Sequence, residues 1–323
     1  MLLENTIQEL VELACLWEAT VPKPGNVHPG AAFADTTYND FVLSARAIGP
    51  VFARAPHLSV GQLVLQAVQA TRQAVGKNTN LGIILALAPL AKAVNETDIP
   101  SILNQLTIDD AAQVYEAIRV AQPGGLGQAD SQDVYDQPTV TLLEAMRLAA
   151  DRDLIARQYV TGYREVLSFL LPTLIEELDK SLPDQTWRTL AWWRTTLRDC
   201  EFFVAAASRR RGVVRSPNHH RRRDAAATRS LASQSIQATF LHGLATLGDT
   251  LISRKCGAVV MHEAQARAAA VLTAGWPHRD IGQAAYEAFD AWLRADGHRR
   301  NPGTMADLMA ATLYLLLRRI STG

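Results

Sequence analysis

The clearest helix signal in this chain is NPGTMADLMAATLYLLL, residues 301–317. Asn301 suits the N-cap of a helix and Pro302 its first position, where the missing N–H costs nothing. No charged residue occurs from Leu308 to Leu317. The carboxylate of Asp307, at the start of this apolar run, is therefore expected to be buried and to need a partner: an arginine, a hydrogen-bond donor or a metal ion.

The same three- and four-residue spacing of apolar residues continues through nearly the whole chain. Alternating strand patterns bounded by turn residues are nearly absent. We therefore predict an all-α protein, a single large domain over residues 1–323 with about twelve helices. The predicted helical ranges are 3–20, 38–55, 60–76, 79–94, 108–121, 139–150, 153–180, 184–207, 229–254, 256–274, 278–295 and 303–320.

The composition is that of an ordinary globular protein, with 48% hydrophobic and 20% charged residues. It excludes a disordered chain and a disulfide-dense scaffold. The 32 basic and 32 acidic residues cancel, but the stretch 209–223 holds seven arginines and no acid. This run has no aromatic residue for stacking on bases and belongs to no recognisable nucleic-acid module. We interpret 209–228 as an Arg-rich flexible insertion and predict no nucleic-acid partner.

The sequence favours a cytoplasmic protein. The longest uncharged stretch, 231–248, contains Ser, Gln, Thr and His, so no membrane partner is predicted. Glu4 lies where a secretory signal would carry positive charge. The three cysteines, Cys15, Cys200 and Cys256, are far apart and are interpreted as buried thiols in a reducing compartment. No pattern indicates the oligomeric state.

Two loops between predicted helices carry candidate binding residues. In VPKPGNVHPG, residues 21–30, two prolines restrain the backbone around Lys23, which suits contact with phosphate. In GKNTNLG, residues 76–82, polar residues open an apolar helix, and helix N-termini bind anions. A rigid connector with a solvated lysine, and ordinary helix capping, remain alternative explanations of these two loops.

A third group of candidates is acidic. Several aspartates lie in loops or at helix ends, among them Asp35, Asp249 and Asp307. Such residues suit Mg²⁺, which prefers oxygen ligands and a bound polyphosphate, although structural salt bridges explain them as well. The chain has no P-loop, dinucleotide fingerprint, zinc-protease motif or nucleophile elbow.

Taken in order, these motifs resemble the triphosphoribosyl-dephospho-CoA synthase family over about residues 12 to 317. The last motif is similar to the family's Ser-Pro-Gly-Gly-x-Ala-Asp-Leu signature. The ordered set is more specific than any single motif. It consists of EATVPKPGNV (18–27), FVLSA (41–45), Asn78-Thr79-x-x-Gly82, RQYVTGY (157–163), Asp249-Thr250 and NPGTMADL (301–308).

The resemblance implies an all-helical enzyme that joins ATP to 3′-dephospho-CoA and releases adenine, which yields the precursor of a prosthetic group. A ribose hydroxyl of dephospho-CoA attacks C1′ of the ATP ribose, and the triphosphate stays on the transferred sugar. Such a site needs cations around phosphate, a carboxylate that takes the hydroxyl proton, and stabilisation of an oxocarbenium-like centre.

From this resemblance we assign roles to the matching residues. Asp35, Asp249 and Asp307 are predicted to share the catalytic general-base role and the coordination of Mg²⁺. Lys23 and Arg254 are predicted to contact phosphate, and Asn78 and Thr79 to hold phosphate or ribose. The full set of predicted substrate-binding residues is Lys23, Gly25, Asn26, Asn78, Thr79, Arg157, Arg254, Asn301 and Gly303.

The chain departs from the family pattern at several positions. Phe33 replaces a histidine, Asn80-Leu81 replaces His-Lys, and Arg157-Gln158 represents Arg-Gly-Glu. Two alternatives therefore stay open. One is a related ribosyl or phosphoribosyl transferase acting on another acceptor, such as the precursor of a pterin-like one-carbon cofactor. The other is a non-catalytic protein that binds a nucleotide or CoA.

Overall fold

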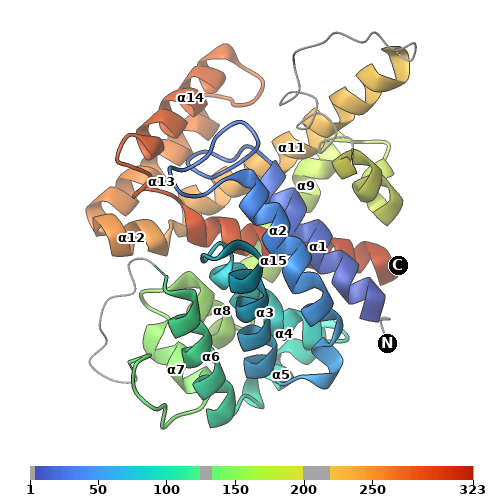
Figure 1. Ribbon diagram of the computed structural model, residues 1–323. Helices are drawn as coiled ribbons and strands as arrows, with labels where there is room; N and C mark the ends of the chain where they lie inside the picture. Colours follow the sequence, from blue (N-terminus) through green and yellow to red (C-terminus); the bar gives the residue numbers. More distant parts are fainter. Residues whose placement is uncertain (1–3, 124–132, 199–218, 323) are drawn as a thin grey trace.

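The computed structural model describes residues 4–123, 133–198 and 219–322. Within these residues every regular element is a helix, and the only β-type pairing is the isolated bridge between His28 and Ala31 (Figure 1). The predicted all-α class is therefore confirmed. The main helices are α1 (Glu4–Thr20), α2 (Tyr38–Ala53), α3 (Val60–Val75), α4 (Leu81–Lys92), α5 (Ile99–Asn104), α6 (Ile108–Ala121), α7 (Leu142–Ala149), α8 (Leu154–Thr161), α9 (Leu171–Ser181), α11 (His219–Leu247), α12 (Thr250–Cys256), α13 (Ala258–Thr273), α14 (Asp280–Arg294) and α15 (Gly303–Thr322).

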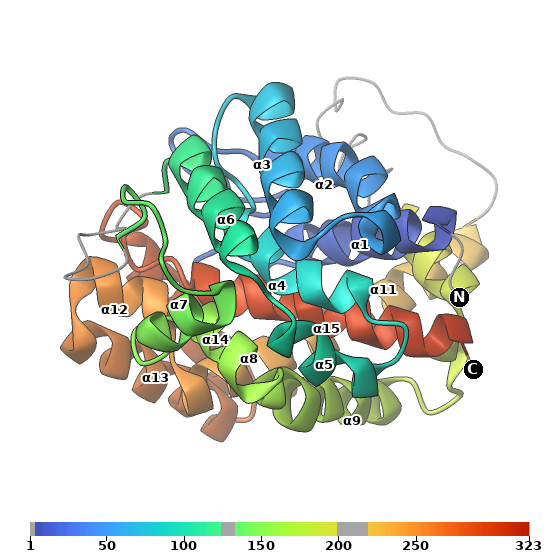
Figure 2. The ribbon, with the colours of Figure 1, turned by 90° about the horizontal axis from the view of Figure 1, so that it is seen from below.

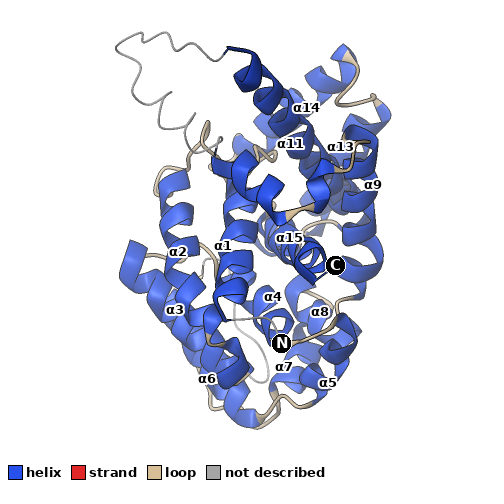
Figure 3. Cartoon of the chain, turned by 90° about the vertical axis from the view of Figure 1, so that its right-hand side faces the viewer, coloured by secondary structure: helices blue, strands red, loops and turns tan. Residues whose placement is uncertain are grey.

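The last helix, α15, is the centre of the molecule. It packs against α1, α4, α9, α11 and α12, and every residue from Thr304 to Arg318 except Asp307 is buried. Figure 2 shows α15 running through the middle of the fold. The helices α3 to α8 lie at one end of the molecule and α11 to α14 at the other (Figures 1 and 3). No helix in the described ranges is long and apolar enough to cross a membrane.

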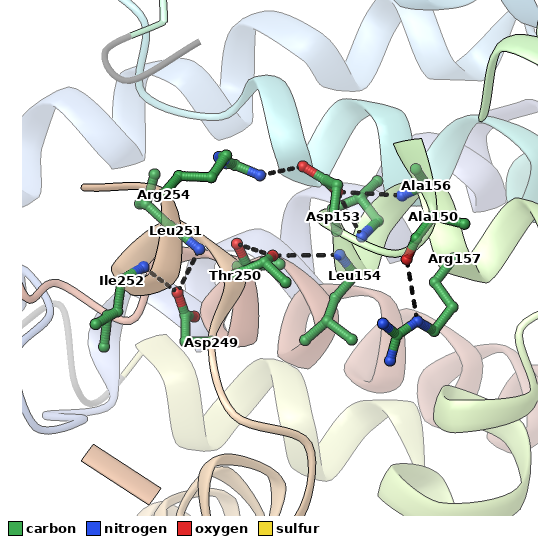
Figure 4. Close-up of polar contacts among 12 residues, drawn as sticks. Ala150, Asp153, Leu154, Ala156, Arg157, Asp249, Thr250, Leu251, Ile252 and Arg254 are labelled. Atoms are coloured by element: carbon green, nitrogen blue, oxygen red, sulfur yellow. Dashed lines mark hydrogen bonds and ion pairs between the residues drawn. The ribbon is translucent and has the colours of Figure 1, made fainter. Parts of the chain in front are cut away.

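The first turn of α15 is held by a residue of another helix. Asn301 was predicted to cap this turn, but its Oδ1 instead accepts a hydrogen bond from Asn26 Nδ2 at 2.8 Å. The Met305 N–H donates to Asp249 Oδ2 at 2.8 Å. The other oxygen of Asp249 accepts from the N–H groups of Leu251 and Ile252 at 2.9 and 3.0 Å, in the first turn of α12 (Figure 4). A single buried carboxylate therefore caps two helices, which replaces the predicted cap.

The other end of α15 is fixed to α4. The buried guanidinium of Arg318 donates to the carbonyl of Leu90 at 2.9 Å and to the carbonyl of Ala93. Carbonyl groups at the end of a helix have no partner within the helix, and a cation is favoured there by the helix dipole. Arg318 thus satisfies the C-terminal carbonyls of α4 in a place that water does not reach.

Two predicted helices are each divided in the structure. The range 153–180 breaks at Gly162 and Tyr163, which both have positive φ, and it continues as the π-helical turn η3 (Val166–Leu170) and then α9. The range 229–254 breaks at Gly248, with φ of 71°, and α12 starts after Asp249. The short helix α5 lies in none of the predicted helical ranges. Apolar spacing alone does not reveal breaks at which the pattern resumes in the same phase.

Two further expectations concern parts of the chain that are only partly described. Residues 209–218 of the Arg-rich run lie outside the described residues, and 219–228 form the start of α11. Cys15 is buried and Cys256 is half-buried, while Cys200 lies outside the described residues.

We predict that Asp249→Ala lowers the free energy of unfolding by about 2–4 kcal/mol, since two helix starts lose their cap and the buried Met305 N–H loses its partner. Asp153 is a matched control because it caps only α8, through the N–H groups of Ile155 and Ala156. Asp153→Ala should cost about 1 kcal/mol. Urea unfolding of both variants measures the difference. Equal losses would contradict the double-cap role of Asp249.

Candidate active site

A cavity of about 870 Å³ lies beside the first turn of α15. One part of its wall comes from the loop over residues 26–36, the end of α3, the start of α4, and α12. The remaining part comes from α6, α7 and α8. The cavity therefore lies where the two ends of the fold meet, and the starts of α4 and α15 both face it.

Most of the predicted site residues line this cavity, although they come from distant parts of the sequence. Those in its wall are Asn26, Asp35, Asn78, Thr79, Arg254, Asn301, Gly303 and Asp307. The structure brings them together as one site, which their order along the chain could not show.

Four predicted site residues lie outside the cavity wall: Lys23, Gly25, Arg157 and Asp249. Arg157 Nε donates to the carbonyl of Ala150 at 3.2 Å (Figure 4). Gly25 has φ of 76°, and its N–H donates to Asp290. Both of these contacts fix the backbone.

Lys23 lies beneath the cavity as a buried counter-ion. Its side chain is 0% exposed, and Nζ lies 2.9 Å from Glu18 Oε1. Nζ also donates to the carbonyl of Glu18 and, at 3.4 Å, to that of Val21. Glu18 is itself almost fully buried and lines the cavity. The ammonium of Lys23 therefore stabilises a negative charge at the cavity wall from behind.

Asp307 is the second enclosed carboxyl of the cavity. It makes no hydrogen bond or ion pair with the described residues. Burial raises the pKa of Asp307 well above its usual range, and the charges of Glu18, Asp249 and Asp153 raise it further, while Arg254 opposes the shift. This environment therefore favours the protonated, neutral form of Asp307 over a wider pH range than for an ordinary aspartate.

Gly82 makes the space that Asp307 occupies. A Cβ atom on Gly82 would lie 1.9 Å from Asp307 Oδ2. Gly82 is the second residue of α4, so the carboxyl of Asp307 rests directly on the backbone of that helix start. The motif Asn78-Thr79-x-x-Gly82 therefore has a steric reason for its glycine.

Asp249 contrasts with Asp307. Burial raises its pKa to about 6, against the opposing effect of the N–H groups of Met305, Ile252 and Leu251. Both of its oxygens accept hydrogen bonds from these backbone N–H groups. Asp249 therefore caps the helices beside the site and does not line the cavity.

Among the described residues, five cationic side chains line the cavity. Arg254 pairs with Asp153 (Figure 4), and Lys77 Nζ lies 3.1 Å from Asp40 Oδ2. The other three, Arg72, Arg152 and Lys255, make no ion pair with any described residue. Uncompensated cations around a cavity suit a ligand with several phosphate groups.

Several of these residues were not predicted as site residues. Glu18 and Lys77 were present in the motifs, as the first residue of EATVPKPGNV and in GKNTNLG, and their position beside matched residues is the signal that could have identified them. Lys255 has the same signal, since it directly follows Arg254, whereas Arg72 and Arg152 have none, because each resembles an ordinary solvated residue at or near a helix end.

Three of the four residues that depart from the family pattern line the cavity: Phe33, Asn80 and Leu81. The ring of Phe33 packs on that of His298 with centroids 4.3 Å apart. Gln158, in contrast, is fully buried away from the cavity, and its Nε2 donates to Leu154 O and to Glu165.

The predicted metal ligands do not meet as one cluster. Within the described ranges no three His, Cys, Asp or Glu side chains form a group that could hold a metal ion. A Mg²⁺ ion that arrives with a nucleotide takes most of its ligands from phosphate and water, so one or two carboxylates suffice. Asp35 fits that requirement, since it is exposed on the cavity rim and, of the residues that the structure describes, only Thr36 donates to its side chain, at 3.0 Å.

Comparison with known proteins gives one family. A model of the family ATP:dephospho-CoA triphosphoribosyl transferase matches residues 4–201 and 218–322. The gap between these ranges, 202–217, overlaps the first part of the Arg-rich run. No protein of curated function matches the chain.

Among solved structures, the chain is similar to a protein from Archaeoglobus fulgidus that is provisionally assigned as a triphosphoribosyl-dephospho-CoA synthase. The TM-score is 0.57 at 19% identity, and the similarity covers 87% of this chain and 98% of the other. At this identity the likeness supports the fold alone.

The family match spans nearly the whole chain, and the matching motifs converge on one cavity. Neither a different acceptor nor a non-catalytic binding protein is favoured by this match. The chain therefore belongs to the ATP:dephospho-CoA triphosphoribosyl transferase family, and its reaction is the transfer of the triphosphoribosyl group of ATP to dephospho-CoA.

Proposed function

We propose that the cavity beside α15 is where this transfer takes place, and that Glu18 and Asp307 divide its two proton transfers. One observation supports this proposal above the others. Two carboxyls of the described residues contrast within the cavity: Glu18 has a lysine behind it, whereas Asp307 forms no ion pair with any described residue and has a raised pKa. Pairs of carboxyls in such different environments are typical of an acid and a base acting together.

The reaction forms a bond between a ribose hydroxyl oxygen of dephospho-CoA and C1′ of ATP, and it breaks the bond from C1′ to N9 of adenine. In this proposal the hydroxyl proton passes to the carboxylate of Glu18. The leaving adenine receives a proton from the carboxyl of Asp307. Lys23 is then a positioning residue, since it touches Glu18 and not the substrates.

Both substrates are polyanions, so their charge is complementary to the cationic part of the cavity wall. Arg72, Lys77 and Lys255 would hold the triphosphate of ATP, with Arg254 sharing its charge between Asp153 and the ligand. Asn78 and Thr79 would contribute at the start of α4. Asn78 Oδ1 already accepts from the Leu81 N–H at 3.1 Å, so its side-chain NH₂ is available to a phosphate or ribose oxygen.

Mg²⁺ would be held by Asp35 together with the phosphates of ATP, because Asp249 has no free oxygen. When bound, the ion would neutralise part of the charge of the triphosphate. The expected compartment is the cytoplasm, where free thiols such as those of Cys15 and Cys256 stay reduced.

The reaction is tested by incubating the protein with ATP, Mg²⁺ and dephospho-CoA and measuring free adenine by chromatography. We expect adenine only when dephospho-CoA is present, and turnover lowered at least ~10²-fold in Glu18→Gln and in Asp307→Asn, the usual effect of one catalytic proton-transfer group. Glu96→Gln is the control, because Glu96 pairs with the exposed Arg319 far from the cavity. Near-normal turnover in either cavity variant, correctly folded, would refute its assigned role.

The raised pKa of Asp307 gives the pH profile a definite direction. Because the proposed acid must be protonated, kcat/KM should fall as pH rises through the pKa of Asp307, above the usual aspartate range. Residual activity of Asp307→Asn should lack this fall. The variant should also lose less activity with an ATP analogue whose electron-poor purine leaves without protonation. An unchanged alkaline limb in Asp307→Asn would contradict the assignment.

Gly82→Ala tests whether the position of Asp307 matters. Alanine normally stabilises a helix relative to glycine by about 0.5–1 kcal/mol, but here its Cβ would displace the Asp307 carboxyl. We expect a folded protein, by circular dichroism, with kcat lowered at least ~10-fold. The same change in an Asp307→Asn background should cause little further loss, since the two residues act together. Additive losses would show that Gly82 acts independently of Asp307.

A further inference from the structure

The cavity has a second part with different chemistry. Its wall over α6, α7 and α8 is mainly apolar and includes Ile118, Ala145, Met146, Leu148 and Ile155. Leu148 is 53% exposed, although leucine favours the protein interior. Ile118 and Met146 are only partly buried and pack against the core on their inner side. Leu148, and part of the side chains of Ile118 and Met146, therefore remain uncovered in the cavity wall.

A cation lies at one end of this apolar wall. Arg152 is in the turn directly after α7, its backbone N–H donates to Ala149 O at 3.0 Å, and its exposed side chain lines the cavity. It makes no ion pair with any described residue. The wall therefore offers a positive charge beside a surface formed mainly by apolar side chains.

This sequence of properties matches one of the two substrates, given the function proposed above. ATP consists of adenine, ribose and triphosphate, and its adenine is the leaving group, so it must lie at the reacting centre beside Asp307. Dephospho-CoA consists of adenosine, a diphosphate and a long uncharged pantetheine arm. Only the acceptor has an anionic group joined directly to an extended uncharged chain.

We propose that the apolar wall of α6, α7 and α8 binds the pantetheine arm of the acceptor and that Arg152 binds the adjoining diphosphate. The wall thereby distinguishes dephospho-CoA from ADP, which has the same adenosine and two phosphates but no arm. Burying even two methylene groups contributes about 1.6 kcal/mol, or roughly a tenfold change in affinity.

The experiment measures binding by calorimetry with two ligands that share the adenosine and the diphosphate, of which only dephospho-CoA carries the arm. Wild-type protein should bind dephospho-CoA at least ~10-fold more tightly than ADP, and Leu148→Asp should reduce this ratio to near 1. The affinity for ATP should stay unchanged. Leu43→Asp is the matched control, because Leu43 is also an exposed helical leucine, at 40%, but lies outside the cavity wall.

Arg152→Ala separates the two halves of the proposal. It should weaken dephospho-CoA and ADP by the same factor, since both carry the diphosphate. Equal binding of the two ligands by the wild type would overturn the arm site, and so would a Leu148→Asp variant that loses affinity for ATP instead. These binding results do not require turnover, so they are distinct from a failure of the adenine-release assay, which would refute the proposed function itself.

Discussion

The burial of α15 is the constraint on which the rest of this structure depends. From Thr304 to Arg318 only Asp307 escapes full burial, so each polar group along the helix must find its partner inside the protein. The free N–H of Met305 takes a carboxylate from the start of α12, and Arg318 supplies donors to the end of α4. The helix is thereby joined at each end to an element that also borders the cavity.

The same constraint explains why Asp307 is available for chemistry. Its neighbours on α15 are enclosed by other helices, whereas Asp307 faces Gly82 of α4, which has no side chain. A carboxyl fixed on a rigid, buried helix loses little further freedom when it acts. The buried pair of Glu18 and Lys23 provides the opposite environment a short distance away. Such a pair contributes little to stability on balance, because desolvation of both ions offsets their attraction. Its value lies in holding a negative charge at a cavity wall.

Much of the fold could be predicted from the sequence, because amphipathic spacing reports directly which helix faces are buried. The breaks at Gly162 and Gly248 could not, since apolar residues continue on both sides of each. For the site, the motifs led to most of the cavity wall, including Asp307, but the expected environment of Asp307 was wrong: its side chain is not fully buried, and no described residue is hydrogen-bonded or ion-paired to it. They could not show that both oxygens of Asp249 accept hydrogen bonds from helix N–H groups, because a capping aspartate and a ligand aspartate look alike in sequence. Arg152 could not be predicted either, because only tertiary packing brings the turn after α7 to the cavity.

The residues that depart from the family pattern differ in their position relative to the cavity. Gln158 lies away from the cavity and bonds to Leu154 and Glu165, so it concerns the packing of α8 rather than the substrates. Phe33, Asn80 and Leu81 do line the cavity, but among the described residues none of them is hydrogen-bonded to Glu18 or Lys23. The cavity also keeps a lysine next to Asn78, in Lys77, although Leu81 has no charge. The changed positions therefore alter the cavity wall, while the two carboxyls and the cations to which we assign roles in the reaction are all present.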